Sequence, residues 1–157
     1  MSYRLVYPFD ETGIRPDLAK TIFERFGFEF GSMISVPVIV QFLKKDGTWT
    51  TVDMFFDTGA IVSLLSAQVG EEVGLEKYVS HRLSGISKKE ECTVPVRVSR
   101  VKARLVDSYG NMSPEIDLWA AFAEEAVPNV LGMKDIISRF KFETDPAEKK
   151  LYLTWKK

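Results

Sequence analysis

The residues best suited to chemistry in this sequence form one short run, Phe55-Phe56-Asp57-Thr58-Gly59-Ala60. An apolar segment ends at an acid, and removing a carboxylate from water disfavours its charged form. Gly59 permits a tight turn whose N–H group can approach that carboxylate. The Thr58 hydroxyl can donate a hydrogen bond that holds the loop rigid. We therefore interpret Asp57 as an aimed, reactive carboxylate whose loop is supported by Thr58, Gly59, Ala60 and Ser63.

Hydrolysis of an amide by carboxylate acid–base catalysis needs two carboxylates. Two such groups about 3 Å apart share one proton, so one can activate a water while the other polarises the carbonyl. Asp53 shares a strand face with Asp57 and is interpreted as a solvated charge. The remaining candidates within the chain have no comparable glycine turn; they are Asp107, Asp117, Asp135 and Asp145. A homodimer would supply the second carboxylate, because a two-fold interface brings the same residue from both copies to its centre.

The overall composition excludes several classes of function. With 157 residues, 45% of them hydrophobic, the chain is long enough for one core and one domain. A net charge of −1 gives no electrostatic footprint for nucleic acid. Cys92 and His81 are the only residues of their types, so neither a disulfide nor a metal site is expected. The apolar runs are too short to span a membrane, and the start lacks a signal-peptide pattern. We expect a cytoplasmic protein without cofactors.

The elements that must position Asp57 follow from the residue pattern. Leu18, Ile22 and Phe26 recur at helical spacing, and Gly27 stands where a helix ends, which predicts an amphipathic helix over 17–26. We interpret this helix as a lid on the rest of the molecule, with a docking or dimerisation helix as the alternative.

Most of the remaining pattern is typical of strands. Asp46-Gly47 is a hairpin signal between two β-rich runs. Strands are expected at 3–7, 34–42, 49–56, 94–105 (a strand pair or one bent strand), 116–122 and, as a hairpin, 142–153; short helices are expected at 69–75 and 133–140. Many short strands with few helices predict a mainly β fold, a barrel or a sandwich-like domain.

The motifs also occur in a familiar order. The Asp57 loop with Ser63 resembles the catalytic loop of the retropepsin-like aspartic proteases, the single-domain relatives of retroviral protease. Leu83-Ser84-Gly85-Ile86 stands where such proteins carry a glycine-containing flap. The segment 129–137, with Val130-Leu131-Gly132, is similar to their apolar-apolar-Gly segment leading into a short helix.

This resemblance implies a fold, a function and a set of site residues. The fold is the closed β-barrel of the retropepsin-like acid proteases, with a protease domain at 32–157 and an N-terminal helical extension at 1–31. The function is a homodimeric aspartic endopeptidase that acts on an extended polypeptide, with Asp57 from each copy as the catalytic pair. Ser84, Gly85 and Ile86 would form the flap, and Ile61, Val62, Val130 and Leu131 would bind substrate.

Two departures from the family pattern keep an alternative open. Retroviral members carry an arginine directly after the equivalent of Gly132, where it helps to hold the dimer, and here Met133 occupies that place. The segment 88–91 after the flap motif is strongly charged. Dimer stability must therefore rest on other contacts. The alternative function is a non-catalytic, dimeric peptide-binding or scaffold module on the same fold.

Overall fold

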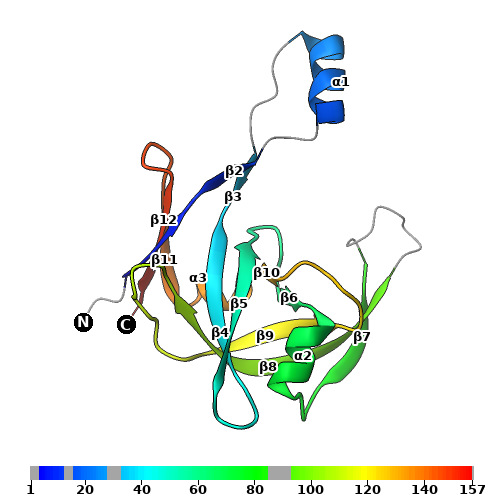
Figure 1. The fold of residues 1–157 in the computed structure, drawn as a ribbon, viewed down its shortest axis with the longest axis vertical. Coiled ribbons are helices and arrows are strands. Elements are labelled where there is room, and N and C mark those ends of the chain that lie inside the picture. Colours follow the sequence, from blue (N-terminus) through cyan, green and yellow to red (C-terminus); the bar gives the residue numbers. More distant parts are fainter. Residues whose placement is uncertain (1–3, 13–15, 28–32, 85–92, 157) are drawn as a thin grey trace.

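Six strands of the chain close into a barrel. The computed structural model describes residues 4–12, 16–27, 33–84 and 93–156. Within these residues the ring is hydrogen-bonded in the order β4 (Pro37–Leu43), β5 (Trp49–Phe56), β10 (Val130–Leu131), β6 (Ser63–Leu65), β9 (Ile116–Ala123) and β8 (Val94–Val106), and a β4–β8 pairing closes it. β7 (Val79–Leu83) extends the sheet from β8 (Figure 1). The prediction of a mainly β, closed barrel is confirmed.

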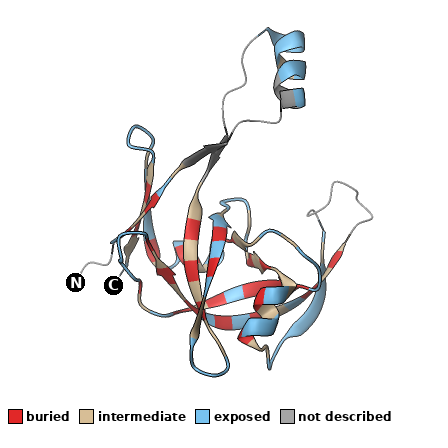
Figure 2. Cartoon of the chain, in the orientation of Figure 1, coloured by how far each residue is buried: buried red, intermediate tan, exposed pale blue. Residues whose placement is uncertain are grey.

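Alternation of apolar residues along the strands builds the core. In β4, Val38, Val40 and Phe42 are buried while the residues between them are partly exposed. Figure 2 shows a similar alternation along much of β8, whereas β9 alternates only as far as Trp119 and is buried throughout 120–123. β8 is a single long strand that pairs with β7, β9 and β4 in turn, which decides between the two interpretations of its sequence.

The N-terminal strand belongs to the body of the protein. β1 (Arg4–Pro8) pairs with β12 (Lys150–Trp155), which also pairs with β11 (Phe140–Asp145). Leu5 and Tyr7 are buried in the same core as Leu151 and Leu153. The predicted division at residue 31 therefore does not separate two structural units. The alternating apolar residues of β1 become buried because the strand packs on the C-terminal hairpin and the barrel core.

The helices are short. α2 (Ala67–Val73) buries Val69 and Val73 and ends at Gly74, which has φ 73°. α3 (Lys134–Ile137) is shorter than the helix predicted over 133–140, because the chain enters β11 at Phe140. Within the described ranges, no helix is long and apolar enough to cross a membrane.

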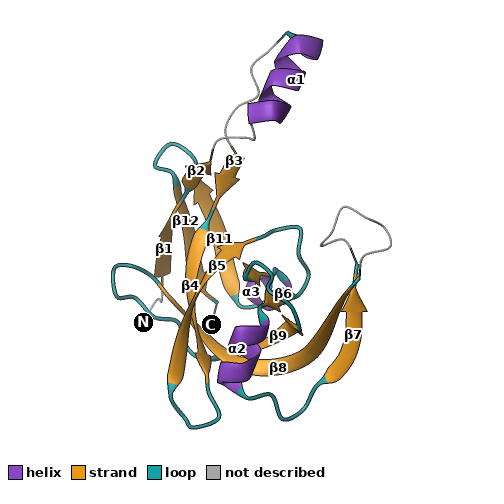
Figure 3. Ribbon diagram, turned by 45° about the vertical axis from the view of Figure 1, so that its right-hand side comes forward, coloured by secondary structure: helices purple, strands orange, loops and turns teal. Residues whose placement is uncertain are grey.

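An arm stands out from the barrel. We use this name for the two-stranded ribbon of β2 (Asp10–Thr12) and β3 (Met33–Ser35) together with α1 (Pro16–Phe26), which the ribbon carries. The predicted strand over 34–42 is split at Val36 into β3 and β4. Figures 1 and 3 both show α1 clear of the barrel, so the predicted lid is wrong. The ribbon continues outward from β4 and holds the helix away from the core.

Candidate active site

Asp57 lies at the point where β5 leaves the barrel sheet. Its backbone N–H donates to Leu131 O at 3.0 Å, and its own carbonyl accepts from Ala60 N at 3.2 Å. The Gly59 N–H donates to Asp57 Oδ1 at 2.8 Å, as the sequence predicted. The carboxylate is therefore held on a tight turn by the backbone that follows it.

The Asp57 loop is locked around a second segment of the chain. β10 lies between β5, to which it is parallel, and β6, to which it is antiparallel. Beyond β10, Met133 N donates to Ala60 O at 2.9 Å and Lys134 N donates to Ile61 O at 3.0 Å. The loop between β5 and β6 therefore wraps around the segment that begins at β10 and leads into α3. Such an enclosed loop cannot move without breaking these bonds.

Only glycine fits at position 132, where the loop between β5 and β6 encloses the segment that follows β10. A Cβ atom there would lie 2.5 Å from the Val62 carbonyl carbon and 2.9 Å from Ile61 O. The Gly132 N–H donates to the Oγ of Ser63 at 3.0 Å, and Ser63 is itself buried. The sequence placed Ser63 among the residues that support the Asp57 loop. Its hydroxyl instead joins β6 to the Gly132 segment, which lies 69 positions away in the chain.

Asn129 is a positioning residue that the sequence analysis did not single out. Its carbonyl accepts from Phe55 N at 3.0 Å, and its side-chain oxygen accepts from Ser66 N at 2.9 Å. It thereby joins the end of β5 to the start of α2. A polar residue directly before an apolar pair and a glycine was the available signal, but its partners are far away in sequence.

An open hollow of about 680 Å³ adjoins Asp57. Apart from Asp57 and Ser84, its side chains are apolar. Its lining consists of Asp57, Gly59, Ala60, Ile61, Val62, Leu64, Leu83, Ser84, Pro128 and Val130. Leu64, Leu83 and Pro128 were not predicted as site residues. The arrangement offers one carboxylate at the rim of a groove with space for apolar side chains.

The structure brings together most, but not all, of the predicted site residues. Ile61, Val62, Val130 and Ser84 line the hollow. Leu131 does not, because successive strand residues face opposite sides and Leu131 is 0% exposed in the core. Thr58 is exposed beside Asp57. Gly85 and Ile86 lie outside the described residues.

The expectation that Asp57 is already desolvated is wrong for a single chain. Asp57 is exposed, and Phe55, two positions earlier on the same strand face, is 51% exposed. The apolar residues before Asp57 therefore do not cover it. Any removal of water from this carboxylate must come from a further surface placed over the loop.

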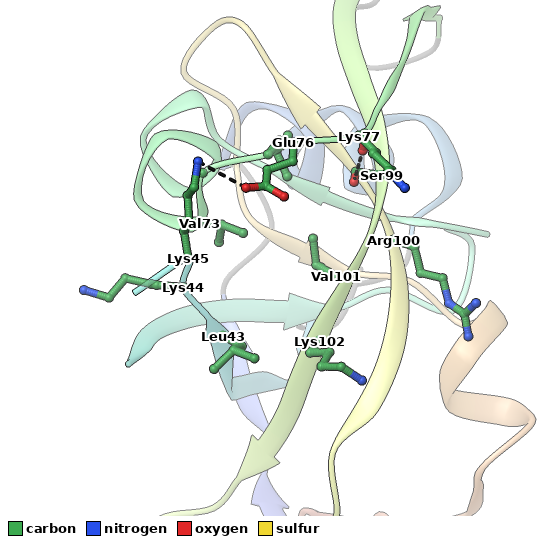
Figure 4. Close-up of a pocket in the computed structure, with 12 residues that line it drawn as sticks. Leu43, Lys44, Lys45, Val73, Glu76, Lys77, Ser99, Arg100, Val101 and Lys102 are labelled. Atoms are coloured by element: carbon green, nitrogen blue, oxygen red, sulfur yellow. Dashed lines mark hydrogen bonds and ion pairs between the residues drawn. The ribbon is translucent and has the colours of Figure 1, made fainter. Parts of the chain in front are cut away.

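A second hollow, of about 490 Å³, contains none of the predicted site residues. It lies between the β4–β5 turn, the residues after α2 and the middle of β8. Figure 4 shows apolar Leu43, Val73 and Val101 at its centre, and the Lys45 ammonium beside the Glu76 carboxylate, 3.1 Å apart. In the described part of the chain, no group of three or more His, Cys, Asp or Glu side chains could hold a metal ion.

Comparison with solved structures identifies the fold. The structure is similar to that of a retropepsin-like aspartic protease from Rickettsia conorii, with a TM-score of 0.56 and 12% identity over 99% of this chain and 93% of that chain. The EIAV protease complexed with an inhibitor is also similar, with a TM-score of 0.38 and 16% identity over 65% of this chain and 85% of that chain. No protein-family model and no curated protein sequence matches the chain. The closed barrel therefore has the retropepsin-like fold.

Proposed function

We propose that this protein is an aspartic endopeptidase that is active as a homodimer. Asp57 from each copy would form the catalytic pair at the two-fold axis. The protease unit would comprise residues 32–157 together with β1, which completes its C-terminal sheet.

The locked Asp57 loop is the observation that carries this proposal. A turn that only reverses the chain does not need a carboxylate fixed by the following N–H group and enclosed around Gly132. Preorganisation of this kind is what a catalytic group requires, because a small displacement of the reacting atoms costs much of the rate. The exposure of Asp57 in one chain agrees with a surface that a second copy covers.

The proposed reaction uses only carboxylates and water. When two Asp57 side chains meet, their charges cannot both persist at close range, so the pair holds one proton. The ionised member takes a proton from a water that attacks the amide carbonyl. The protonated member donates to the carbonyl oxygen as the water oxygen bonds to the carbonyl carbon. The C–N bond then breaks: the proton taken from the water passes to the amine nitrogen, and the other carboxylate takes a proton back from a hydroxyl of the intermediate, which leaves the pair with one proton again. Thr58 would support the two loops by hydrogen bonding across the axis.

The groove supports binding of an extended polypeptide. Ile61, Val62 and Val130 offer apolar surface next to the carboxylate, and Ser84 also lines the groove. A substrate would lie along the groove like an added strand, with backbone hydrogen bonds supplying affinity and side-chain pockets supplying selectivity. The flap motif at Ser84, Gly85 and Ile86 is proposed to cover it.

A direct test compares the wild type with Asp57→Asn on unstructured polypeptides from acidic to neutral pH. The wild type should cleave them with a bell-shaped pH profile, because both the fully ionised and the fully protonated pair are inactive. Asp53→Asn is the matched control: this acid lies on the same face of β5 and is exposed. Cleavage that survives in Asp57→Asn, or a folded wild-type dimer without cleavage, would contradict the proposal.

Inhibitor binding separates catalysis from a scaffold role. Pepstatin imitates the tetrahedral intermediate, so it should raise the melting temperature of the wild-type dimer and not that of Asp57→Asn. A scaffold module would instead bind peptides equally well with either residue at position 57.

A further inference from the structure

The arm extends past the catalytic end of β5. Pro37 pairs with Phe55, and Val36 O accepts from Phe56 N at 2.9 Å. The next residue back along the chain, Ser35, is therefore level with Asp57. β3 then continues beyond that level, and β2 returns alongside it. The ribbon thus extends beyond the end of β5 that Asp57 follows, and Figure 1 shows it projecting away from the barrel.

The arm is built from elements that are weak on their own. An isolated two-stranded ribbon is at best marginally stable in water. α1 has 11 residues, and a lone helix of that length is also marginal. Such elements gain stability by packing an apolar face against another surface. The barrel of the same chain does not supply that surface, because α1 stands clear of it in both views (Figures 1 and 3).

α1 has one apolar stripe and one charged face. Phe26 lies four positions after Ile22 and three after Phe23, so the three residues share one side of the helix, where Phe23 is 57% exposed and Phe26 is 65% exposed. Lys20 and Glu24 lie on the other side and form an ion pair of 3.9 Å in solvent. A helix of this pattern fits an apolar surface by its aromatic stripe while its charged face stays wet.

We propose that α1 packs onto a second copy of this chain, and that the two arms of the dimer each clasp the other copy. This inference rests on the proposed function, which requires a second copy opposite Asp57. An arm that passes the level of Asp57 would reach the space of that second copy. The two-fold symmetry makes the contact reciprocal, so each dimer contains two α1 contacts.

The full-length chain with Phe23→Glu tests the proposal. Glutamate is a good helix former, so the substitution removes the aromatic contact without a penalty in helix propensity. The dimer dissociation constant, measured by analytical ultracentrifugation, should rise roughly tenfold or more, since a buried aromatic at an interface contributes strongly and the dimer loses two. Phe23→Leu should restore most of the affinity. Tyr109→Glu is the matched control, since Tyr109 is 68% exposed in the β8–β9 turn and should leave the constant unchanged.

Activity at two protein concentrations gives a second measurement. Phe23→Glu should be inactive when dilute and should regain wild-type turnover when concentrated enough to dimerise. An unchanged dissociation constant in Phe23→Glu would overturn the role of the arm while leaving the proposed catalysis intact. Conversely, Phe23→Glu could dissociate the dimer while the wild-type dimer never cleaves peptides. That result would support the role of the arm and contradict the proposed catalysis. A wild type that stays monomeric at every concentration would overturn both.

Discussion

Two aspartates of this chain lie in turns of the same local design but in opposite surroundings. Asp57 follows β5, and Asp107 follows β8. In each turn the backbone N–H two positions later donates to Oδ1: Gly59 N at 2.8 Å and Tyr109 N at 3.0 Å. The sequence around Asp107 has no glycine turn comparable to that of Asp57, yet the local hydrogen bond is the same. The difference between the two acids therefore arises outside the turn.

Asp107 is buried and saturated with hydrogen bonds. It is 3% exposed and also accepts from Asn111 N, from Asn111 Nδ2 and from Val6 N, at 2.9, 2.8 and 3.0 Å. The last of these ties β1 to the turn after β8. A carboxylate whose oxygens are all engaged holds structure together and has no lone pair left for a substrate. Asp57, exposed at the rim of the apolar hollow, keeps lone pairs for chemistry.

The largest expected effect is the loss of peptide cleavage when Asp57 is replaced, a loss that replacing Asp107 should not cause. Asp57→Asn keeps an oxygen for the Gly59 N–H but cannot share a proton as a carboxylate does. Peptide cleavage should fall by about 10²- to 10⁴-fold. The free energy of unfolding of the monomer should change by less than about 0.5 kcal/mol, because Asp57 is exposed in a single chain. Denaturant unfolding of the variant checks the second point, and a large loss of stability would mean that Asp57 is structural like Asp107.

Gly132→Ala should break the lock around the Asp57 loop. The added methyl group would overlap the Val62 backbone, 2.5 Å from its carbonyl carbon. Because backbone on both sides must move, we expect a loss of about 3 kcal/mol in stability, together with loss of cleavage. Gly70→Ala is the control, since its methyl group would meet only the Phe122 side chain, at 3.3 Å. Equal stability of the two variants would show that the loop is looser than described.

Asp107→Ala should lower the stability of the fold and leave peptide cleavage unchanged. The change leaves the partly buried N–H groups of Val6 and Asn111 without this acceptor, at a cost of about 2 kcal/mol. Cleavage per folded molecule should equal that of the wild type. Urea unfolding and an activity assay well below the melting temperature measure the two quantities. A selective loss of turnover would place Asp107 in the catalytic machinery and remove the contrast with Asp57.

The smallest effect concerns Tyr7, a buried residue whose hydroxyl bonds to the backbone next to Asp107. The Tyr7 hydroxyl donates to Val106 O at 3.0 Å, and burial, followed by the negative charge of Asp107, raises the pKa of Tyr7. Unfolded tyrosine loses its proton near pH 10, whereas folded Tyr7 keeps it, so stability should fall as the pH rises above about 10. Tyr7→Phe should cost about 1 kcal/mol at pH 7 and reduce this alkaline loss. Unfolding titrations from pH 7 to 11 test this, with exposed Tyr109→Phe as the control.

The local part of the fold and the site could be predicted from the sequence. The alternation in β4 and β5, the Asp46-Gly47 turn and the tight turn at Asp57 depend on neighbours only a few positions apart. Three features could not be predicted from the sequence: that β1 packs with the C-terminal hairpin, that α1 stands clear of the barrel, and that Leu131 lies in the core. Each depends on which distant segment packs alongside: β12 against β1, open solvent around α1, and the core beneath β10.

By itself, the sequence determined a mainly β chain with one glycine-turned aspartate and a later apolar pair ending at Gly132. Only the tertiary structure decided that β10 lies between the two strands flanking Asp57, and that Ser63 and Gly132 bond across 69 positions. It also decided that Asp107 is buried while Asp57 is exposed. The physical reason is that a turn's hydrogen bonds are local, whereas burial is set by whichever strands close over a residue.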